Sequence, residues 1–196
     1  MRRTACAAAI FLLVCAASEG RAQSLTVVPC RAAFGAAFGV SGTGDRAAEQ
    51  TGPSRDAGAS FELPISSQWS ARADFGTATW TFQDRDPWDV LLGQERVRVD
   101  RLTLSAINHG PQSCGAPLRV FVGLGAGVYR YRFQAQHAET MTGGLHGVFG
   151  VDVLPAESFA IAGEIGIDAA GGPRRGPVFS TVLWMIRATV SAKFLF

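Results

Sequence analysis

The sequence is poor in the residues from which metal and redox sites are built. It has 4 cysteines and 3 histidines in 196 residues, no two cysteines form a CxxC pair, and His109, His137 and His146 are not at ligand spacing. Beyond residue 22 it also lacks any run of about 18 apolar residues, which a spanning helix would need. These absences exclude helical membrane spans and argue against a metal site. We expect no cofactor.

The N-terminus has the composition of a secretory signal peptide. Two arginines precede an apolar run at residues 5–17, and small residues stand at Gly20 and Ala22, as a signal peptidase requires. The run is too short for a membrane anchor, which needs roughly 20 residues. We expect residues 1–22 to be removed and residues 23–196 to form one domain. The chain has a formal charge of +2, but the signal holds three arginines and one glutamate. The rest is formally neutral, so nucleic-acid binding is not predicted.

Only two cysteines remain once the signal is removed. They are Cys30 and Cys114, far apart in the chain. An exported protein meets an oxidising compartment, so these two are the candidate pair for one disulfide. The bond requires their Cα atoms to come within about 7 Å.

Hydrophobicity alternates with a period of two through the rest of the chain, which is typical of β-strands with two different faces. In residues 118–133, for example, Val120, Val122 and Leu124 share one face, and Phe121 and Gly123 share the other. Eight such segments occur, at about residues 33–41, 58–66, 69–80, 97–107, 118–133, 144–153, 159–168 and 179–196. Most are close to the 9–11 residues that a tilted strand needs to cross a bilayer. The pattern predicts an all-β protein, an eight-stranded antiparallel up-and-down transmembrane β-barrel.

The predicted connections alternate in length, as in outer-membrane barrels with long outer loops and short periplasmic turns. The long, polar or glycine-rich connections are residues 42–57, 81–96, 134–143 and 169–178, and the short ones are 67–68 and 154–158. The connection 108–117 breaks the alternation because it is long and holds two prolines. We expect both termini to lie in the periplasm and the long loops to be exposed to the exterior.

Alternation alone fits a soluble barrel with an apolar interior equally well. The loop asymmetry and aromatic residues near strand ends favour the membrane, because such residues form girdles at the bilayer interfaces. The residues assigned to these girdles are Trp69, Trp80, Tyr129, Tyr131, Phe159 and Trp184. The apolar register then faces lipid, and the opposite register places charges in the lumen. This predicted lumen network consists of Glu62, Arg72, Asp74, Arg101, Glu164, Asp168, Arg187 and Lys193.

Two segments resemble a known family. The chain ends on Phe194-Leu195-Phe196, and the tail resembles the C-terminal signal of bacterial outer-membrane proteins, in which a terminal aromatic follows apolar residues at alternate positions. Residues 122–129 are similar to the glycine-rich strand of the OmpA-like outer-membrane β-barrel family. The resemblance implies an outer-membrane location in contact with lipid and lipopolysaccharide. It also implies that Phe194 and Phe196 are recognised by the barrel-assembly machinery.

No motif identifies a catalytic site. Gly123, Gly125 and Gly127 lie on one strand face without the following helix of a dinucleotide site. A serine nucleophile needs a histidine within hydrogen-bond reach, and the strand pattern gives no such pair. The sequence therefore predicts a non-enzymatic structural or interaction protein whose exposed loops could contact an extracellular ligand. A narrow gated channel and a lipid A-modifying enzyme stay open as alternatives.

Overall fold

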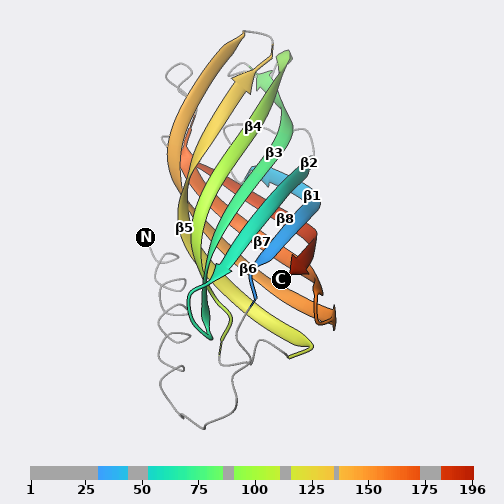
Figure 1. Cartoon of the computed structure of the whole chain (residues 1–196). Coiled ribbons are helices and arrows are strands. Elements are labelled where there is room, and N and C mark those ends of the chain that lie inside the picture. The colour runs from blue at the N-terminus through green and yellow to red at the C-terminus, as the bar shows by residue number, and fades with distance from the viewer. Residues whose placement is uncertain (1–30, 44–52, 86–90, 111–115, 135–136, 173–181) are drawn as a thin grey trace, which may run out of the picture.

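The computed structural model describes residues 31–43, 53–85, 91–110, 116–134, 137–172 and 182–196, which form one closed antiparallel barrel (Figure 1). Each strand pairs with its neighbour in the chain, and the first pairs with the last. The strands are β1 (Ala33–Thr43), β2 (Ser54–Pro64), β3 (Trp69–Arg85), β4 (Leu91–Asn108), β5 (Leu118–Phe133), β6 (Ala138–Ala156), β7 (Phe159–Gly171) and β8 (Val182–Leu195). The predicted eight-stranded barrel is confirmed.

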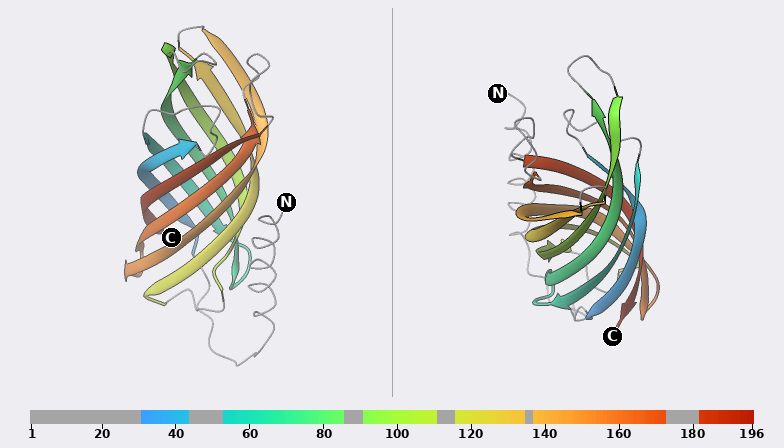
Figure 2. Two further views of the ribbon diagram at one scale, coloured as in Figure 1. Left: turned by 180° about the vertical axis from the view of Figure 1, so that it is seen from behind. Right: turned by 90° about the horizontal axis from the view of Figure 1, so that it is seen from above.

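The barrel closes through β1 and β8. Their register runs from Ala33 opposite Leu195 to Thr43 opposite Met185. Along the length that all eight strands share, closure pairs every strand on both sides, which is how a β-structure satisfies its backbone hydrogen bonds in lipid. Figure 2 shows the wall from behind and from above. The barrel end at which β1 begins and β8 finishes is called the inner end below, and the opposite one is the outer end.

Burial alternates along the strands with the polarity of a membrane protein. Large apolar side chains point outward and are exposed, as with Phe38 (70%), Leu104 (66%) and Leu145 (69%). Charged side chains such as Asp168 and Lys193 point inward and are buried. A soluble barrel would show the reverse, so the outer face is the surface that meets hydrocarbon. Among the described residues, no helix is long and apolar enough to cross a membrane.

Glycines make room for the interior arginines. Gly76 lies directly opposite Arg101 in the β3–β4 register, and Gly166 lies opposite Arg187 in β7–β8. A Cβ atom on either glycine would overlap the guanidinium of the facing arginine. The missing side chains therefore let two long cations fold flat against the wall of a narrow barrel.

Several strands are longer than predicted, so the predicted loops were too long. The loop expected at 81–96 is wrong in extent, because β3 continues to Arg85 and β4 starts at Leu91. Similarly, β6 begins at Ala138 within the predicted loop 134–143. At the outer end, β3 to β6 reach beyond the neighbouring strands (Figure 1). The connections 42–57 and 169–178 are also shortened, by β2 from Ser54 and by β7 to Gly171.

Some predictions fall outside the described residues. These are the signal peptide at 1–22, Cys30 and Cys114, so the cleavage and the disulfide stay predictions.

Candidate functional site

The interior of the barrel is the most highly charged part of the described structure. All eight residues of the predicted lumen network point inward and are at most 9% exposed. They come from five strands: β2 (Glu62), β3 (Arg72, Asp74), β4 (Arg101), β7 (Glu164, Asp168) and β8 (Arg187, Lys193). Because each unpaired buried ion costs several kcal/mol, their partners decide whether this interior is stable.

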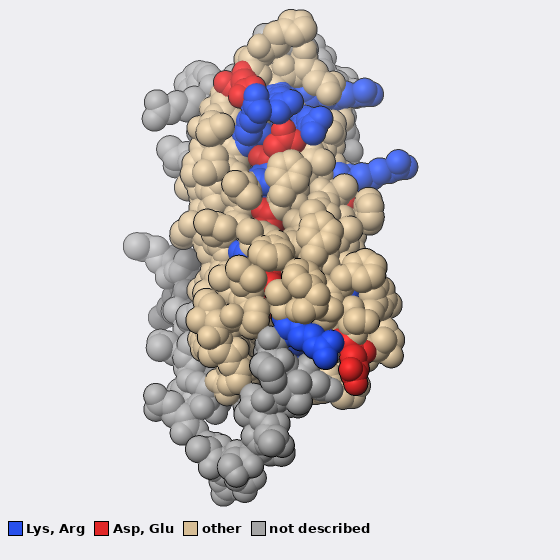
Figure 3. Space-filling view, viewed as in Figure 1, with Lys and Arg blue, Asp and Glu red and all other residues tan. Residues whose placement is uncertain are grey.

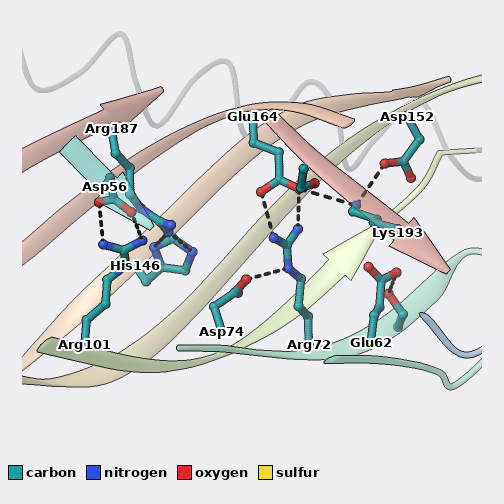
Figure 4. A network of polar contacts seen from close by, with 12 residues as sticks. Asp56, Glu62, Arg72, Asp74, Arg101, His146, Asp152, Glu164, Arg187 and Lys193 are labelled. Carbon is teal, nitrogen blue, oxygen red and sulfur yellow. Dashed lines mark hydrogen bonds and ion pairs between the residues drawn. The ribbon is translucent and has the colours of Figure 1, made fainter. Parts of the chain in front are cut away.

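Arg72 and Glu164 form a bridge across the middle of the lumen (Figure 4). The guanidinium donates from Nη1 to Glu164 Oε1 at 3.0 Å and from Nη2 to Oε2 at 2.7 Å, and its Nε donates to Asp74 Oδ1 at 2.8 Å. In the closed order, β3 and β7 are separated by three strands on either side, so they stand on opposite walls. Two parallel charge-assisted hydrogen bonds therefore join the far sides of the barrel.

A second group of polar side chains lies towards the outer end. Arg101 donates two hydrogen bonds to Asp56, at 2.6 and 2.7 Å. Asp168 accepts from the Tyr129 hydroxyl at 2.7 Å and lies 2.7 Å from His146 Nδ1. A neutral His146 that donates from Nδ1 can accept at Nε2 from Arg187, whose Nη2 is 3.1 Å away. The Arg101–Asp56, Tyr129–Asp168 and Arg187–His146 contacts join alternate strands around the wall, and His146 and Asp168 are direct partners on the adjacent strands β6 and β7.

A third group lies towards the inner end. Lys193 reaches Asp152 Oδ1 at 2.9 Å and Glu164 Oε1 at 3.4 Å, which links it to the central bridge. Arg119 donates to the other oxygen of Asp152 at 2.8 Å. Every inward-facing lysine and arginine that the structure describes is thus between 2.6 and 3.4 Å from a carboxylate oxygen. The interior charges thus form several groups in which cations and carboxylates largely compensate one another.

A serine, a histidine and a carboxylate meet near the inner end. His109 follows the last residue of β4, and the turn behind it is closed by Gly110, which has φ of 67° and donates from its backbone nitrogen to Asn108 Oδ1 at 2.8 Å. This turn leaves His109 buried, with Nε2 at 2.7 Å from Glu62 Oε1 and 3.0 Å from Ser70 Oγ. The sequence placed His109 in a connection without a serine partner, so the pattern analysis missed this contact.

The geometry of that group differs from a hydrolase triad. In a triad the acid holds one imidazole nitrogen and the serine contacts the other. Here both contact Nε2, and Ser70 donates its proton directly to Glu62 at 2.6 Å. His109 Nδ1 is buried without a partner among the described residues, and Ser70 is 2% exposed. The arrangement therefore neither activates Ser70 nor opens it to a substrate.

The outer part of the lumen is filled by an apolar and aromatic cluster. Its buried members are Ala78, Trp80, Val97, Val99, Tyr129, Tyr131, Phe133, Ala170, Leu183 and Met185. Trp80, Tyr129 and Tyr131 are at most 2% exposed, so their assignment to an interface girdle is wrong. Trp69 and Trp184 do lie outside, at 43% and 51% exposed. The inward aromatics lie beyond the charged groups, towards the outer end.

Several network members were not predicted. Asp56 fell in the expected loop 42–57, but β2 begins before it. His146 and Asp152 are buried on the inward face of β6 and were not assigned to the network. Arg119 stands opposite Asp152 at the start of β5. Arg119 stands two residues before Phe121 and therefore on the same, inward face of the strand. This spacing would have placed Arg119 in the network.

The predicted assembly residues lie on the outer face of β8 and just after it. Phe194 is 62% exposed and contacts Phe159 edge to face, with ring centroids 5.6 Å apart. Phe196 is 68% exposed, and its backbone nitrogen donates to Ala32 O at 2.9 Å. Both aromatic rings are thus available at the outer surface of the seam between β1 and β8.

Comparison with known proteins relates the chain to others by structure alone. No family model and no curated protein sequence matches it. Neisserial surface protein A superposes with a TM-score of 0.57 at 10% identity, covering 84% of this chain and 96% of that one. OprG from Pseudomonas aeruginosa gives 0.56 at 13% identity, covering 88% and 100%. The attachment invasion locus protein of Yersinia pestis, solved in complex with the heparin analogue sucrose octasulfate, gives 0.53 at 13% identity, covering 85% and 97%.

These likenesses agree with the chemistry of the two barrel faces. An apolar exterior, a charged and paired interior and eight up-and-down strands are what a small barrel needs in order to stand in a bilayer. The fold implied by the sequence resemblance is confirmed. The chain has the fold and the surface of a small bacterial outer-membrane β-barrel.

Proposed function

We propose that this protein is a closed, non-catalytic barrel of the outer membrane that acts through its outer surface and its outer loops. The single observation that carries the proposal is the Arg72–Glu164 bridge between opposite walls. An eight-stranded barrel is just wide enough to be filled by side chains. A bridge across its middle, with aromatic side chains above it, leaves the exterior as the surface for contacts.

The interior charges are better explained as ion pairs that stabilise the barrel than as a selectivity filter. A conducting pore needs ligands that an ion can enter and leave. Here the inward cations are each engaged by carboxylates, and two of them, Arg72 and Arg101, make two hydrogen bonds to one carboxylate. An ion would have to break these pairs in order to pass. This favours the structural role over the narrow gated channel.

A lipid A-modifying enzyme is the less favoured alternative. Within the part of the chain that the structure describes, the only serine–histidine–carboxylate contact is the one at Ser70, and it faces the lumen. An enzyme acting on a membrane lipid would need its nucleophile on the lipid-facing wall or at the rim. Ser70 is instead an anchor that fixes the connection after β4 to the inside of the barrel.

Conductance tests the closed lumen. We expect the wild-type protein in planar bilayers to give no discrete current steps, because the bridge and the aromatic cluster fill the lumen. A double variant, Arg72→Ser with Glu164→Ser, should conduct, provided that heat-modifiable gel mobility shows it folded. The matched control is Arg130→Ser with Glu139→Ser, an arginine–glutamate pair on the outer wall, 2.5 Å apart. Reproducible ohmic steps from the wild type would refute the closed barrel.

The C-terminal tail is proposed to be read by the barrel-assembly machinery. We expect Phe196→Ala to lower the yield of folded protein in the outer-membrane fraction severalfold and to leave unfolded chain in the periplasm. Phe38→Ala is the control, since Phe38 is an equally exposed outward phenylalanine on β1. Both yields can be measured on immunoblots of fractionated cells. Equal yields for the two variants would mean that Phe196 matters only as lipid-facing surface.

A further inference from the structure

Charged residues gather on one part of the outer wall, above the apolar surface. Figure 3 shows them near the upper end of the barrel, over otherwise uncharged side chains. We call this group the outer-wall arginine cluster, and it consists of Arg96, Arg98, Arg130 and Arg132 with Asp100 and Glu139. It lies outside the lumen, so it is separate from the network described above.

The alternation of side chains along the strands places the cluster on the lipid-facing side of the barrel. Asp100 and Arg98 continue the outward register of Leu102 on β4, Arg130 continues that of Val128 on β5, and Glu139 continues that of Met141 on β6. The β4–β5 register sets Arg98 opposite Arg132, and the β5–β6 register sets Arg132 opposite Glu139. Three adjacent strands thus present one continuous charged surface.

The position of the cluster relative to the hydrocarbon layer follows from the apolar surface beneath it. On β5, the outward positions from Leu118 to Val128 carry no charge. This stretch matches the roughly 9–11 residues that a tilted strand needs to cross the hydrocarbon. Arg130 is the next outward residue, so the cluster begins where the hydrocarbon ends. The inner end is where β1 begins and β8 finishes, so the cluster lies at the opposite end of the barrel, which we assign to the outer leaflet.

The cluster carries an excess of positive charge in a fixed geometry. Asp100 accepts from Thr77 at 2.9 Å and from Arg98 at 2.9 Å, and Arg132 lies 3.2 Å from its other oxygen. Arg130 donates to Glu139 at 2.5 Å, and this hydrogen bond holds the pKa of the Glu139 carboxyl below its ordinary value. Two carboxylates thus orient three guanidinium groups without neutralising them. Arg96 is exposed at the edge of the group.

We propose that the outer-wall arginine cluster binds a phosphate group of lipid A in the outer leaflet. Guanidinium groups bind phosphate through paired charge-assisted hydrogen bonds, and arginine suits this role better than lysine. The acyl chains would lie along the apolar surface of β5 and β6, directly below the phosphate. A soluble anion would have no reason to prefer a site that continues an apolar, lipid-facing wall. The proposal does not depend on whether the lumen conducts.

Lipid binding by charge-matched variants tests the site. Detergent-solubilised protein would be titrated with diphosphoryl lipid A, and bound lipid counted by native mass spectrometry. We expect Arg130→Gln with Arg132→Gln to weaken binding by roughly tenfold, since basic groups at a membrane surface each add to the attraction for anionic lipid. The control is Arg31→Gln with Arg55→Gln, which removes the same charge from exposed arginines outside the cluster. A second double variant, Arg96→Gln with Arg98→Gln, removes the other two arginines of the cluster. It tests the same site if the first double variant fails to fold.

The phosphate dependence separates the possible results. Dephosphorylated lipid A should bind wild type and cluster variants equally, and more weakly than diphosphoryl lipid A binds the wild type. Equal losses in the cluster and control variants would overturn the proposal, because net charge alone would then explain binding. It would also be overturned if heparin bound through the cluster and diphosphoryl lipid A failed to displace it, since the ligand would then be a soluble polyanion.

Discussion

Replacing Glu164 by alanine is expected to lower the free energy of unfolding of the barrel by roughly 3–5 kcal/mol, the cost of stranding one member of a buried ion pair. Glu164 is 5% exposed and receives both terminal nitrogens of Arg72, with Lys193 at 3.4 Å. Its removal leaves Arg72 with Asp74 alone, and both residues are at most 5% exposed. Urea unfolding in lipid vesicles, followed by heat-modifiable mobility, measures the change.

A matched variant shows whether burial causes the loss. Glu157 is also a glutamate, but its side chain is 93% exposed in the turn between β6 and β7, with Arg31 3.8 Å away. Glu157→Ala should therefore leave the unfolding midpoint almost unchanged, because exposed ion pairs contribute little. Arg72→Met and Asp74→Asn combined with Glu164→Ala should be more stable than Glu164→Ala alone, since neither Arg72 nor Asp74 then leaves a stranded charge. Equal midpoints for Glu164→Ala and Glu157→Ala would mean that Glu164 is solvated.

The strands could be predicted from sequence only where they cross the hydrocarbon. Between Leu102 and Leu104, or Ile165 and Ile167, lipid outside and paired polar groups inside force a strict alternation. Beyond the hydrocarbon the outward face carries polar residues and the inward face meets the aromatic cluster, so the alternation reverses although the backbone pairing continues. The β3–β4 ladder still joins Gln83 to Gln94, inside the predicted loop 81–96. The loops were overestimated because the apolar pattern ends before the hydrogen bonds do.

The sequence could predict which charged residues face the lumen, but not which of them pair with one another. Parity alone places Arg72, Asp74 and Glu164 on the inward face. Which residues meet depends on the stagger of the strands around the barrel, which brings β3 to β7 across the lumen. No local sequence pattern records that stagger. Trp80 is an even number of residues from Arg72 on β3, so the alternation of side chains would have placed it inside the barrel too. The error was to assign Trp80 to the interface girdle because it is near a strand end.

Trp80→Ala is expected to destabilise the barrel by roughly 3–5 kcal/mol, the usual cost of removing a tryptophan from a packed core. Trp80 is 2% exposed, packs in the aromatic cluster and donates from Nε1 to Ser41 Oγ at 3.0 Å. Trp184→Ala is the control, because Trp184 is 51% exposed on the lipid-facing wall, where acyl chains can fill the vacated space. Its effect should be less than half as large. Urea unfolding should be followed by circular dichroism, since each change removes a fluorophore. A larger loss in the free energy of unfolding for Trp184→Ala than for Trp80→Ala would contradict this expectation. Tryptophan at the membrane interface would then stabilise this barrel more than packing of its outer lumen does. The aromatic cluster would lose its role as the closure of the barrel.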